Sequence, residues 1–532
     1  MIRARWFYRL GFLLLAAAFA CGGWRLVKRT RPGRAGGPIT LTFAHWQLEG
    51  TTRQAFDALA RDYEKLHPDI RIEQLAIPLS VYSSWGTTHV VGGVAPDLVE
   101  LGRNLGGRRI LPYFLPITDE INRPNPYNAG TPLAGVAWRN TFVDGMEAAF
   151  DPQSFDCYGA SVFANTFRIY YNADLLREIT GQAEPPRTFE QFTDLCRQVR
   201  AFAARTGRPV LPFAGSRIEA PLLMDDLATG QLQRLTSRLN PGVYFPVGYG
   251  DFFLSYLNHE WTLDDPAMRS AIELIRRVGA EMPDNFMQYG RDDSLFYFVQ
   301  GRALMMAGYA QDGTSISSQA PFPVRVFKNP APRPQDREFG GNMVGPNAER
   351  LSSYGAFGIA RASLHPQEAL DFLQFLTSFA ADQKFVRISG FLPVLVGIQA
   401  TGLTRDFMPS SRGFPPGPYP VFLFTNTGQV IQRLEYLMIG PEADQAAFFA
   451  ALKRELPGAM REEVSGGLRN LIQTLQLNDT AIEAVHQLQR ADPANLSLQR
   501  KYQGMVETQN EQEATAYYTE LRLRRAARLP LP

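Results

Sequence analysis

Apolar side chains near the start of the chain follow a pattern that predicts a strand, a helix and a second strand. They alternate over 39–44 and again over 70–75, which is the two-residue period of a strand with one buried face. Between these stretches, apolar residues from 56 to 63 recur at helical spacing behind a capping threonine, and His67-Pro68 predicts the end of that helix. A strand, a helix and a strand in succession favour an α/β unit with a parallel sheet.

Three further helices begin at recognisable signals. Thr188 and Gln191 form a capping box before an apolar face. Pro266 and Pro366 each occupy the first position of a predicted helix, where a missing N–H costs nothing. The stretch 321–346 is rich in proline and glycine and predicts surface loops.

The character of the sequence changes from about residue 441 onward. Glycine and proline become rare and helical periodicity continues to the end, with a break predicted at Asp492-Pro493. The last turns, 520–529, form a basic helical end. We therefore expect a helical extension after the α/β part.

The first 38 residues predict an export signal or anchor followed by a tether. Three arginines precede the apolar run 10–20, and Cys21 follows it, which is the order of a signal peptide with a lipoprotein cleavage site. Phe19 is large for such a site, and the basic flank after Trp24 favours an uncleaved anchor. The sequence allows three alternatives for this segment: lipidation at Cys21, an uncleaved anchor, and a signal peptide that is simply cleaved. Each can place the rest of the chain outside the cytoplasm, in the periplasm or at the outer face of the cytoplasmic membrane.

Charge and cysteine content narrow the classes of function. The chain has 54 basic and 52 acidic residues, and eight of the basic ones lie in 1–34, so the remainder carries a net charge of about −6. A mildly acidic body argues against nucleic acid as a partner. Cys157 and Cys196 are expected to be free buried thiols rather than a disulfide.

Several ordered segments resemble one family, the carbohydrate-type bacterial extracellular solute-binding proteins of the maltose-binding-protein type. Each segment is weak alone, but their order over about 39–395 is specific. Ala173 stands where the family has lysine, and Phe189 and Tyr309 stand where it has tryptophan. The segments are the opening strand with Trp46, the helix ending at 63–70, 92–99 (GGVAPDLV), 170–176 (YYNADLL), 185–189 (PPRTF), 298–309, 357–376 and 390–393 (GFLP).

The resemblance implies an α/β protein of the two-lobed periplasmic-binding-protein fold, type II, with hinge-linked lobes. Ligand would bind between the lobes, and closure about the hinge would deliver it to the permease of an ABC importer. We expect the divisions to be 1–38 for the signal or anchor, 39–160 with 355–395 for the N-terminal lobe, 161–354 with 396–475 for the C-terminal lobe, and 476–532 for the extension.

A sugar needs a flat aromatic surface and a few polar groups that fix its orientation. The candidates lie after predicted strands, because ligands of open α/β sheets bind at the carboxyl ends of strands. Tyr309 is the strongest, since it matches a stacking aromatic of the family and follows Gly308. The predicted ligand-binding residues are Trp46, Gln47, Tyr82, Trp85, Arg103, Asn104, Asn165, Tyr170 and Tyr309.

No motif for catalysis, metal or cofactor stands out in the sequence. Its adjacent aspartates are not the facing pair that glycoside hydrolysis needs, and the six histidines lack ligand spacing. We therefore predict a binding protein with no cofactor. Two alternatives stay open: a secreted carbohydrate-active enzyme, and a membrane-tethered sensory or scaffold protein that uses the same fold and signals through the extension.

Overall fold

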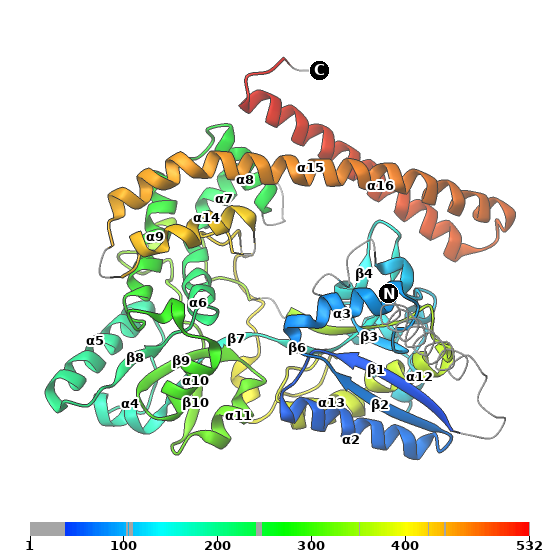
Figure 1. Ribbon diagram of the computed structural model, residues 1–532, viewed down its shortest axis with the longest axis horizontal. Coiled ribbons are helices and arrows are strands. Elements are labelled where there is room, and N and C mark those ends of the chain that lie inside the picture. The colour runs from blue at the N-terminus through cyan, green and yellow to red at the C-terminus, as the bar shows by residue number, and fades with distance from the viewer. Residues whose placement is uncertain are drawn as a thin grey trace, which may run out of the picture.

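The computed structural model describes residues 38–102, 105, 110–240, 247–349, 352–415, 417–423, 425–440 and 443–530. The predictions on Cys21, Arg103 and Asn104 lie outside these residues. Figure 1 shows two α/β lobes side by side, with a pair of long helices across one end. Within the described ranges, no helix has the length and apolar character needed to cross a membrane.

The first lobe is built on a five-stranded sheet. Its order is β2 (Ile70–Ala76), β1 (Ile39–His45), β3 (Leu98–Glu100), β11 (Ser352–Ile359) and β6 (Ala160–Asn165). β1 is parallel to both β2 and β3, whereas β11 is antiparallel to its neighbours. The parallel pairing of β1 and β2 confirms the α/β unit predicted at the start of the chain. The helices of this lobe are α2 (Gly50–Leu66), α3 (Leu79–Val91), α12 (Pro366–Leu376) and α13 (Phe379–Ser389).

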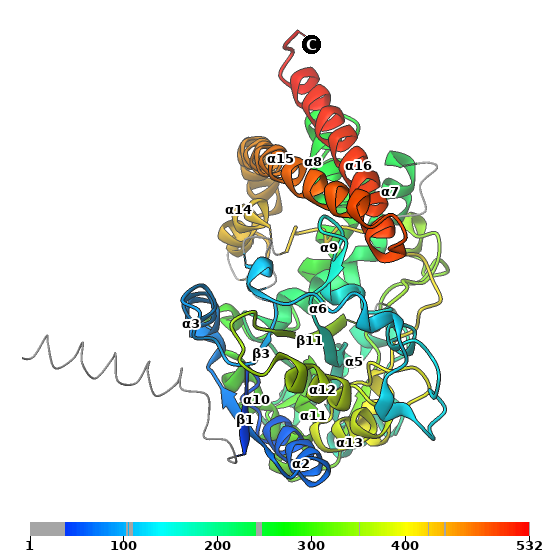
Figure 2. The same ribbon diagram turned by 90° about the vertical axis from the view of Figure 1, so that its right-hand side faces the viewer.

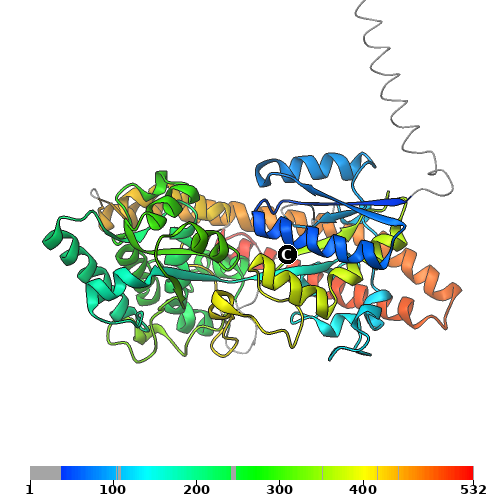
Figure 3. The same cartoon turned by 90° about the horizontal axis from the view of Figure 1, so that it is seen from below.

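The second lobe is built on a four-stranded sheet of order β10 (Val324–Phe327), β7 (Phe167–Asn172), β9 (Ala303–Tyr309) and β8 (Leu211–Ala214). β10 corrects the expectation that 321–346 is loop throughout, because its four residues lie just after Pro323 and are too few to give a clear period. Figure 3 shows the two lobes side by side from below. The helices of the second lobe are α4 (Ala173–Thr180), α5 (Phe189–Thr206), α6 (Glu219–Ala228), α7 (Gln233–Leu239), α8 (Tyr249–Leu257), α9 (Pro266–Gly279), α10 (Arg291–Val299), α11 (Asp312–Gln319) and α14 (Asn426–Leu434).

The capping signals predicted most helix starts correctly. The Thr188 side chain accepts the N–H of Gln191 at 3.2 Å, and the Gln191 side chain accepts the N–H of Arg187 rather than that of Thr188. The helices at Pro266 and Pro366 begin where predicted. α2 begins at Gly50 without a side-chain cap, so the predicted threonine cap was wrong.

The chain passes from the first sheet to the second through a single residue, Thr166, which we call the hinge. The division expected at 160/161 is therefore too early, because β6 pairs with β11 of the first lobe. Cys157 and Cys196 are buried and free, as predicted, and burial raises the pKa of both thiols.

Two long helices form a C-terminal hairpin. α15 (Gln445–Ala491) ends just before Asp492-Pro493, as predicted, and α16 (Leu496–Ala526) packs along it. The division expected at 475/476 falls inside α15. α15 begins against α14 and α8 of the second lobe and extends over the first, and α16 returns (Figures 1 and 2).

α16 contacts both lobes. At its start, Ser497 donates a hydrogen bond to Asp119 at 2.6 Å, and Lys501 forms an ion pair with Asp156 at 2.5 Å, both in the first lobe. At its end, Arg522 forms an ion pair with Glu260 of the second lobe at 2.7 Å. The hairpin is thus a physical connection between the lobes in addition to the chain segments that cross from one to the other.

Replacing Gly504 by leucine is expected to detach α16 from the first lobe. The Phe155 ring packs directly on Gly504, and a Cβ there would lie 2.4 Å from the ring. We expect a loss of about 1–2 kcal/mol in the free energy of unfolding, because overpacking displaces the ring. Urea denaturation measures it. Gly467→Leu on α15 is the matched control, because no atom lies within 4 Å of a Cβ there. Equal stability of the two variants would contradict the packing argument.

Candidate ligand-binding site

The strand ends of both sheets meet at the hinge. β1, β3 and β6 run in one direction, so His45, Glu100 and Asn165 lie at the same carboxyl edge of the first sheet. In the second sheet the end of β9 pairs with the start of β7, with Tyr309 opposite Phe167. The carboxyl edges of the two sheets are therefore brought together where Thr166 joins β6 to β7.

A large open cavity of about 1000 Å³ lies at the strand ends of the second lobe. Its apolar lining combines aromatic side chains with several prolines, two alanines and Leu222. The rings of Phe167 and Tyr309 meet edge to face at 5.1 Å between centroids, and Tyr419 lines the same cavity. Both Phe167 and Tyr309 are half-buried, so part of this aromatic pair is accessible from the cavity.

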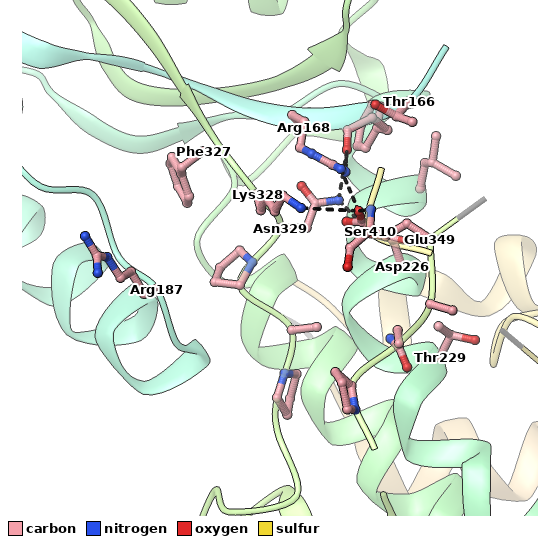
Figure 4. Close-up of a pocket in the computed structure, with 18 of the residues that line it drawn as sticks. Thr166, Arg168, Arg187, Asp226, Thr229, Phe327, Lys328, Asn329, Glu349 and Ser410 are labelled. Carbon is pink, nitrogen blue, oxygen red and sulfur yellow. Dashed lines mark hydrogen bonds and ion pairs between the residues drawn. The ribbon is translucent and has the colours of Figure 1, made fainter. Parts of the chain in front are cut away.

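A cluster of charged groups forms one wall of this second-lobe cavity (Figure 4). Arg168 is 3% exposed, and its Nη2 donates to Glu349 Oε2 at 2.8 Å. The same carboxylate oxygen accepts the N–H of Ser410 at 2.6 Å and lies 3.8 Å from Lys328 Nζ. Glu349 is therefore held by two side chains and one backbone group.

Asp226 and Asn329 extend this wall. Asn329 Nδ2 donates to Asp226 Oδ2 at 2.6 Å. Burial raises the pKa of the Asp226 carboxyl, and the Asn329 hydrogen bond and the charge of Arg168 only partly oppose it. Among the described residues, Arg168 Nε and Asn329 Oδ1 are buried without a hydrogen-bond partner. A donor and an acceptor at the cavity wall are thus left unsatisfied.

The first lobe presents Trp46 at a smaller cavity of about 340 Å³, which Asp151 and Ser353 also line. Trp46 is half-buried and its ring meets Tyr82 edge to face at 4.9 Å. Gly102 lies under the indole with a φ of +111°, and a Cβ there would lie 3.2 Å from the ring. This close approach explains why glycine follows the β3 strand.

Glu100 supports Trp46 from beneath. The backbone N–H of Trp46 donates to one Glu100 carboxylate oxygen at 3.1 Å, and Gln47 Nε2 donates to the other at 2.9 Å. Gln47 is 7% exposed, so its amide is directed to Glu100 rather than to a ligand. Burial raises the pKa of Glu100 to about 8.

Two predicted ligand contacts are corrected by burial. Tyr82 and Tyr170 both have no exposed surface. The Tyr82 hydroxyl donates to the Glu100 carbonyl at 2.9 Å, and the Tyr170 hydroxyl donates to the Tyr309 carbonyl at 2.6 Å. Both tyrosines position the strand ends that carry Trp46 and Tyr309. The alternation in 170–171 does not reveal this, because both tyrosines are buried.

Of the other predicted residues, two line a cavity and one lies on a helix. Asn165 and Tyr309 line the same second-lobe cavity. Asn165 Oδ1 accepts the Ala310 N–H at 3.1 Å, which ties the end of β6 to the turn after β9. Trp85 is half-buried on α3 against His89, with 4.5 Å between ring centroids.

A third cavity, of about 350 Å³, is lined by both lobes. The start of α2 faces α10 and α11 there, and Arg291 forms an ion pair with Asp312. Burial raises the pKa of Asp312 to about 6, against the opposing charge of Arg291. Asp312 also accepts the Tyr309 N–H at 2.9 Å. The backbone of Tyr309 is therefore fixed on both sides.

Sequence reasoning missed much of the second-lobe wall. Lys328 and Asn329 follow β10 directly, so the strand-end rule would have found them had that strand been predicted. The sequence carries no comparable signal for Asp226, Glu349 and Tyr419, which come from a helix and from connecting segments. Within the described part of the chain, no group of three or more His, Cys, Asp or Glu side chains is placed to hold a metal ion.

Comparisons with known proteins agree with this architecture. The family model described as bacterial extracellular solute-binding protein matches residues 113–407. A curated relative, an uncharacterised ABC transporter extracellular-binding protein of Pyrococcus horikoshii, is 21% identical over 397 residues, which cover 73% of this chain and 80% of the relative.

Solved structures share the fold at low sequence identity. The binding protein RafE in complex with raffinose is 18% identical with a TM-score of 0.55, and the match covers 79% of this chain and all of RafE. A chitin oligosaccharide binding protein is 13% identical with a TM-score of 0.56, and the match covers 80% of this chain and all of that protein. The GacH receptor of Streptomyces glaucescens was solved unliganded and with acarbose. It is 15% identical with a TM-score of 0.52, and the match covers 80% of this chain and 99% of GacH. With a family model matching more than half of its residues, this chain belongs to the bacterial extracellular solute-binding proteins.

Proposed function

We propose that this protein binds a saccharide between its lobes, outside the cytoplasm, and delivers it to the permease of an ABC importer. The observation that carries the proposal is the half-buried pair Phe167 and Tyr309, which lies beside polar side chains that line the same cavity at the hinge. An aromatic surface suits the C–H face of a sugar ring, and directional polar groups suit its hydroxyls.

Closure about the hinge is the proposed mechanism. Trp46 lines a cavity of the first lobe and Tyr309 one of the second, each at a strand-end edge. A saccharide that touched both would favour the closed arrangement, because only that arrangement makes both sets of contacts. Tyr82, Glu100 and Tyr170 hold the two aromatic residues in place for this purpose.

The comparisons support the proposal without identifying the ligand. RafE and GacH were solved with raffinose and acarbose, and the Pyrococcus horikoshii relative is named as part of an ABC transporter. A thermal-shift screen of the full chain against oligosaccharides tests the proposal, since a ligand that binds only the folded form raises the melting temperature. No shift with any saccharide would contradict it, and hydrolysis of the saccharide would favour the enzyme alternative.

Replacing Tyr309 by alanine is expected to weaken saccharide binding by about 1–3 kcal/mol, because the ring's buried apolar surface is lost. The fold should persist, since the hydrogen bonds of Tyr309 to Tyr170 and Asp312 use backbone atoms. Isothermal titration calorimetry measures the change. Tyr436→Ala is the control, because that side chain is 59% exposed and lines none of the three cavities described above. Unchanged affinity in a folded Tyr309 variant would remove it from the site.

A further inference from the structure

The second-lobe cavity carries more positive than negative charge. Its lining includes two acidic side chains, Asp226 and Glu349. The rest of the chain has the opposite balance, with a net charge of about −6 outside 1–34. A basic cavity in an acidic body concentrates positive potential at the cavity. The basic side chains that line it are Arg168, Arg187, Lys328, Arg333 and Arg412.

Arg333 and Arg412 have no ion pair with a carboxylate among the described residues, and Lys328 has only a long one. Lys328 Nζ lies 3.8 Å from Glu349, which Arg168 already engages at 2.8 Å. Arg333 donates to the backbone carbonyl of Arg187, an uncharged acceptor. Arg412 is exposed and has no ion pair with any residue that the structure describes. Their positive charge is therefore available to a ligand.

The two carboxyl groups of the lining do little to offset this charge. Glu349 is held by Arg168 and by the Ser410 N–H. Asp226 accepts from Asn329, and burial favours its uncharged form. Arg168 also has its buried Nε without a partner among the described residues. An uncharged sugar would satisfy the aromatic surface but would leave Arg333 and Arg412 without a counter-charge and Lys328 with only the long contact to Glu349.

We infer that the ligand is an anionic saccharide, a sugar chain bearing carboxylate or sulfate groups, whose charge is bound by Lys328 and Arg412. This inference rests on the proposed function and names its ligand class. An arginine guanidinium presents paired N–H donors that match a carboxylate or sulfate edge, and a lysine adds a point charge. The aromatic pair Phe167 and Tyr309 would bind the sugar ring that carries the group.

Calorimetry on the full chain tests the inference with charged and neutral saccharides of equal length. The probes are uronic-acid disaccharides such as digalacturonate, sulfated galactose disaccharides, and the matching neutral disaccharides. We expect at least one charged probe to bind tenfold or more tightly than its neutral counterpart at low salt. Its affinity should fall as salt rises, whereas that of the neutral sugar should not. The two charged sets distinguish carboxylate from sulfate recognition.

Two variants locate the charge recognition. Lys328→Gln and Arg412→Gln should each lower the affinity for the charged probe about fivefold to tenfold, and should lower the affinity for neutral sugars by less. Arg337→Gln is the matched control, because it removes the same charge from the second lobe at a residue that does not line the cavity. Equal affinity for charged and neutral sugars, or variants without selective effect, would overturn the inference and leave saccharide binding standing. Failure of every saccharide to bind would overturn both.

Discussion

Replacing Arg168 by methionine is expected to lower the free energy of unfolding by about 3–5 kcal/mol. Methionine fills similar space but leaves Glu349 without its closest cation, and it removes the positive charge near the buried Asp226. Because Arg168 is 3% exposed, water cannot replace it without a rearrangement of the wall. Denaturant unfolding at pH 7 measures the loss.

A double variant separates this charge effect from packing. Arg168→Met combined with Glu349→Gln should recover part of the loss, because the half-buried Glu349 carboxylate is then no longer left without its closest cation. Arg187→Met is the control, since Arg187 lines the same cavity but pairs with Glu184 at the surface, where both side chains are about 74% exposed. Such exposed pairs contribute little. If Arg168→Met proved as mild as Arg187→Met, the wall would not depend on the ion pair.

Glu100 is expected to make the protein less stable as pH rises. Its folded pKa of about 8 lies above its ordinary value of 4.5, because burial disfavours the charged form. A group whose pKa is raised by folding stabilises most below its unfolded pKa, and that contribution is lost as pH rises toward the folded value. Between pH 5 and pH 8 the loss from Glu100 alone is about 3 kcal/mol.

Glu100→Gln removes this dependence while keeping the shape of the side chain. The Gln47 amide can turn over to accept from the new amide, so the contact at 2.9 Å can be retained. We expect the stability difference between variant and natural protein to shift by about 3 kcal/mol in favour of the variant from pH 5 to pH 8. Other buried carboxyls, such as Asp382 and Glu435, titrate in both proteins and cancel. Parallel pH profiles in urea would contradict the assignment.

Local patterns predicted the fold better than they predicted the site. Periodicity and proline signals placed β1, β2, α9 and the break at Asp492-Pro493, because each depends on residues close in sequence. β10 was not predicted, because a four-residue strand between prolines is too short to show a period. The lobe boundary at Thr166 was not predicted, because it depends on which strand β6 pairs with. Strand pairing joins residues that are far apart in the sequence.

In the site, too, some residues could be predicted from local sequence and others depend on long-range contacts. Tyr309 was predicted because it matches a stacking aromatic of the family and follows Gly308, and Asn165 because it precedes the 170–172 motif; both line the second-lobe cavity. Tyr82 lies on α3 and Tyr170 lies within β7, and both are fully buried, since their hydroxyls bind backbone carbonyls inside the lobes. Glu349 reaches the cavity only because its segment crosses between the lobes, 181 residues after its partner Arg168 in the chain.

The C-terminal hairpin has a mechanical consequence for the two lobes. α16 is bonded to Asp119 and Asp156 at one end and to Glu260 at the other. Two rigid bodies joined along one edge swing freely, but two bodies joined along an edge and also by a crossbar form a closed linkage. Any swing of the lobes must then bend the crossbar or slide one of its ends, so its stiffness enters the energy of every swing.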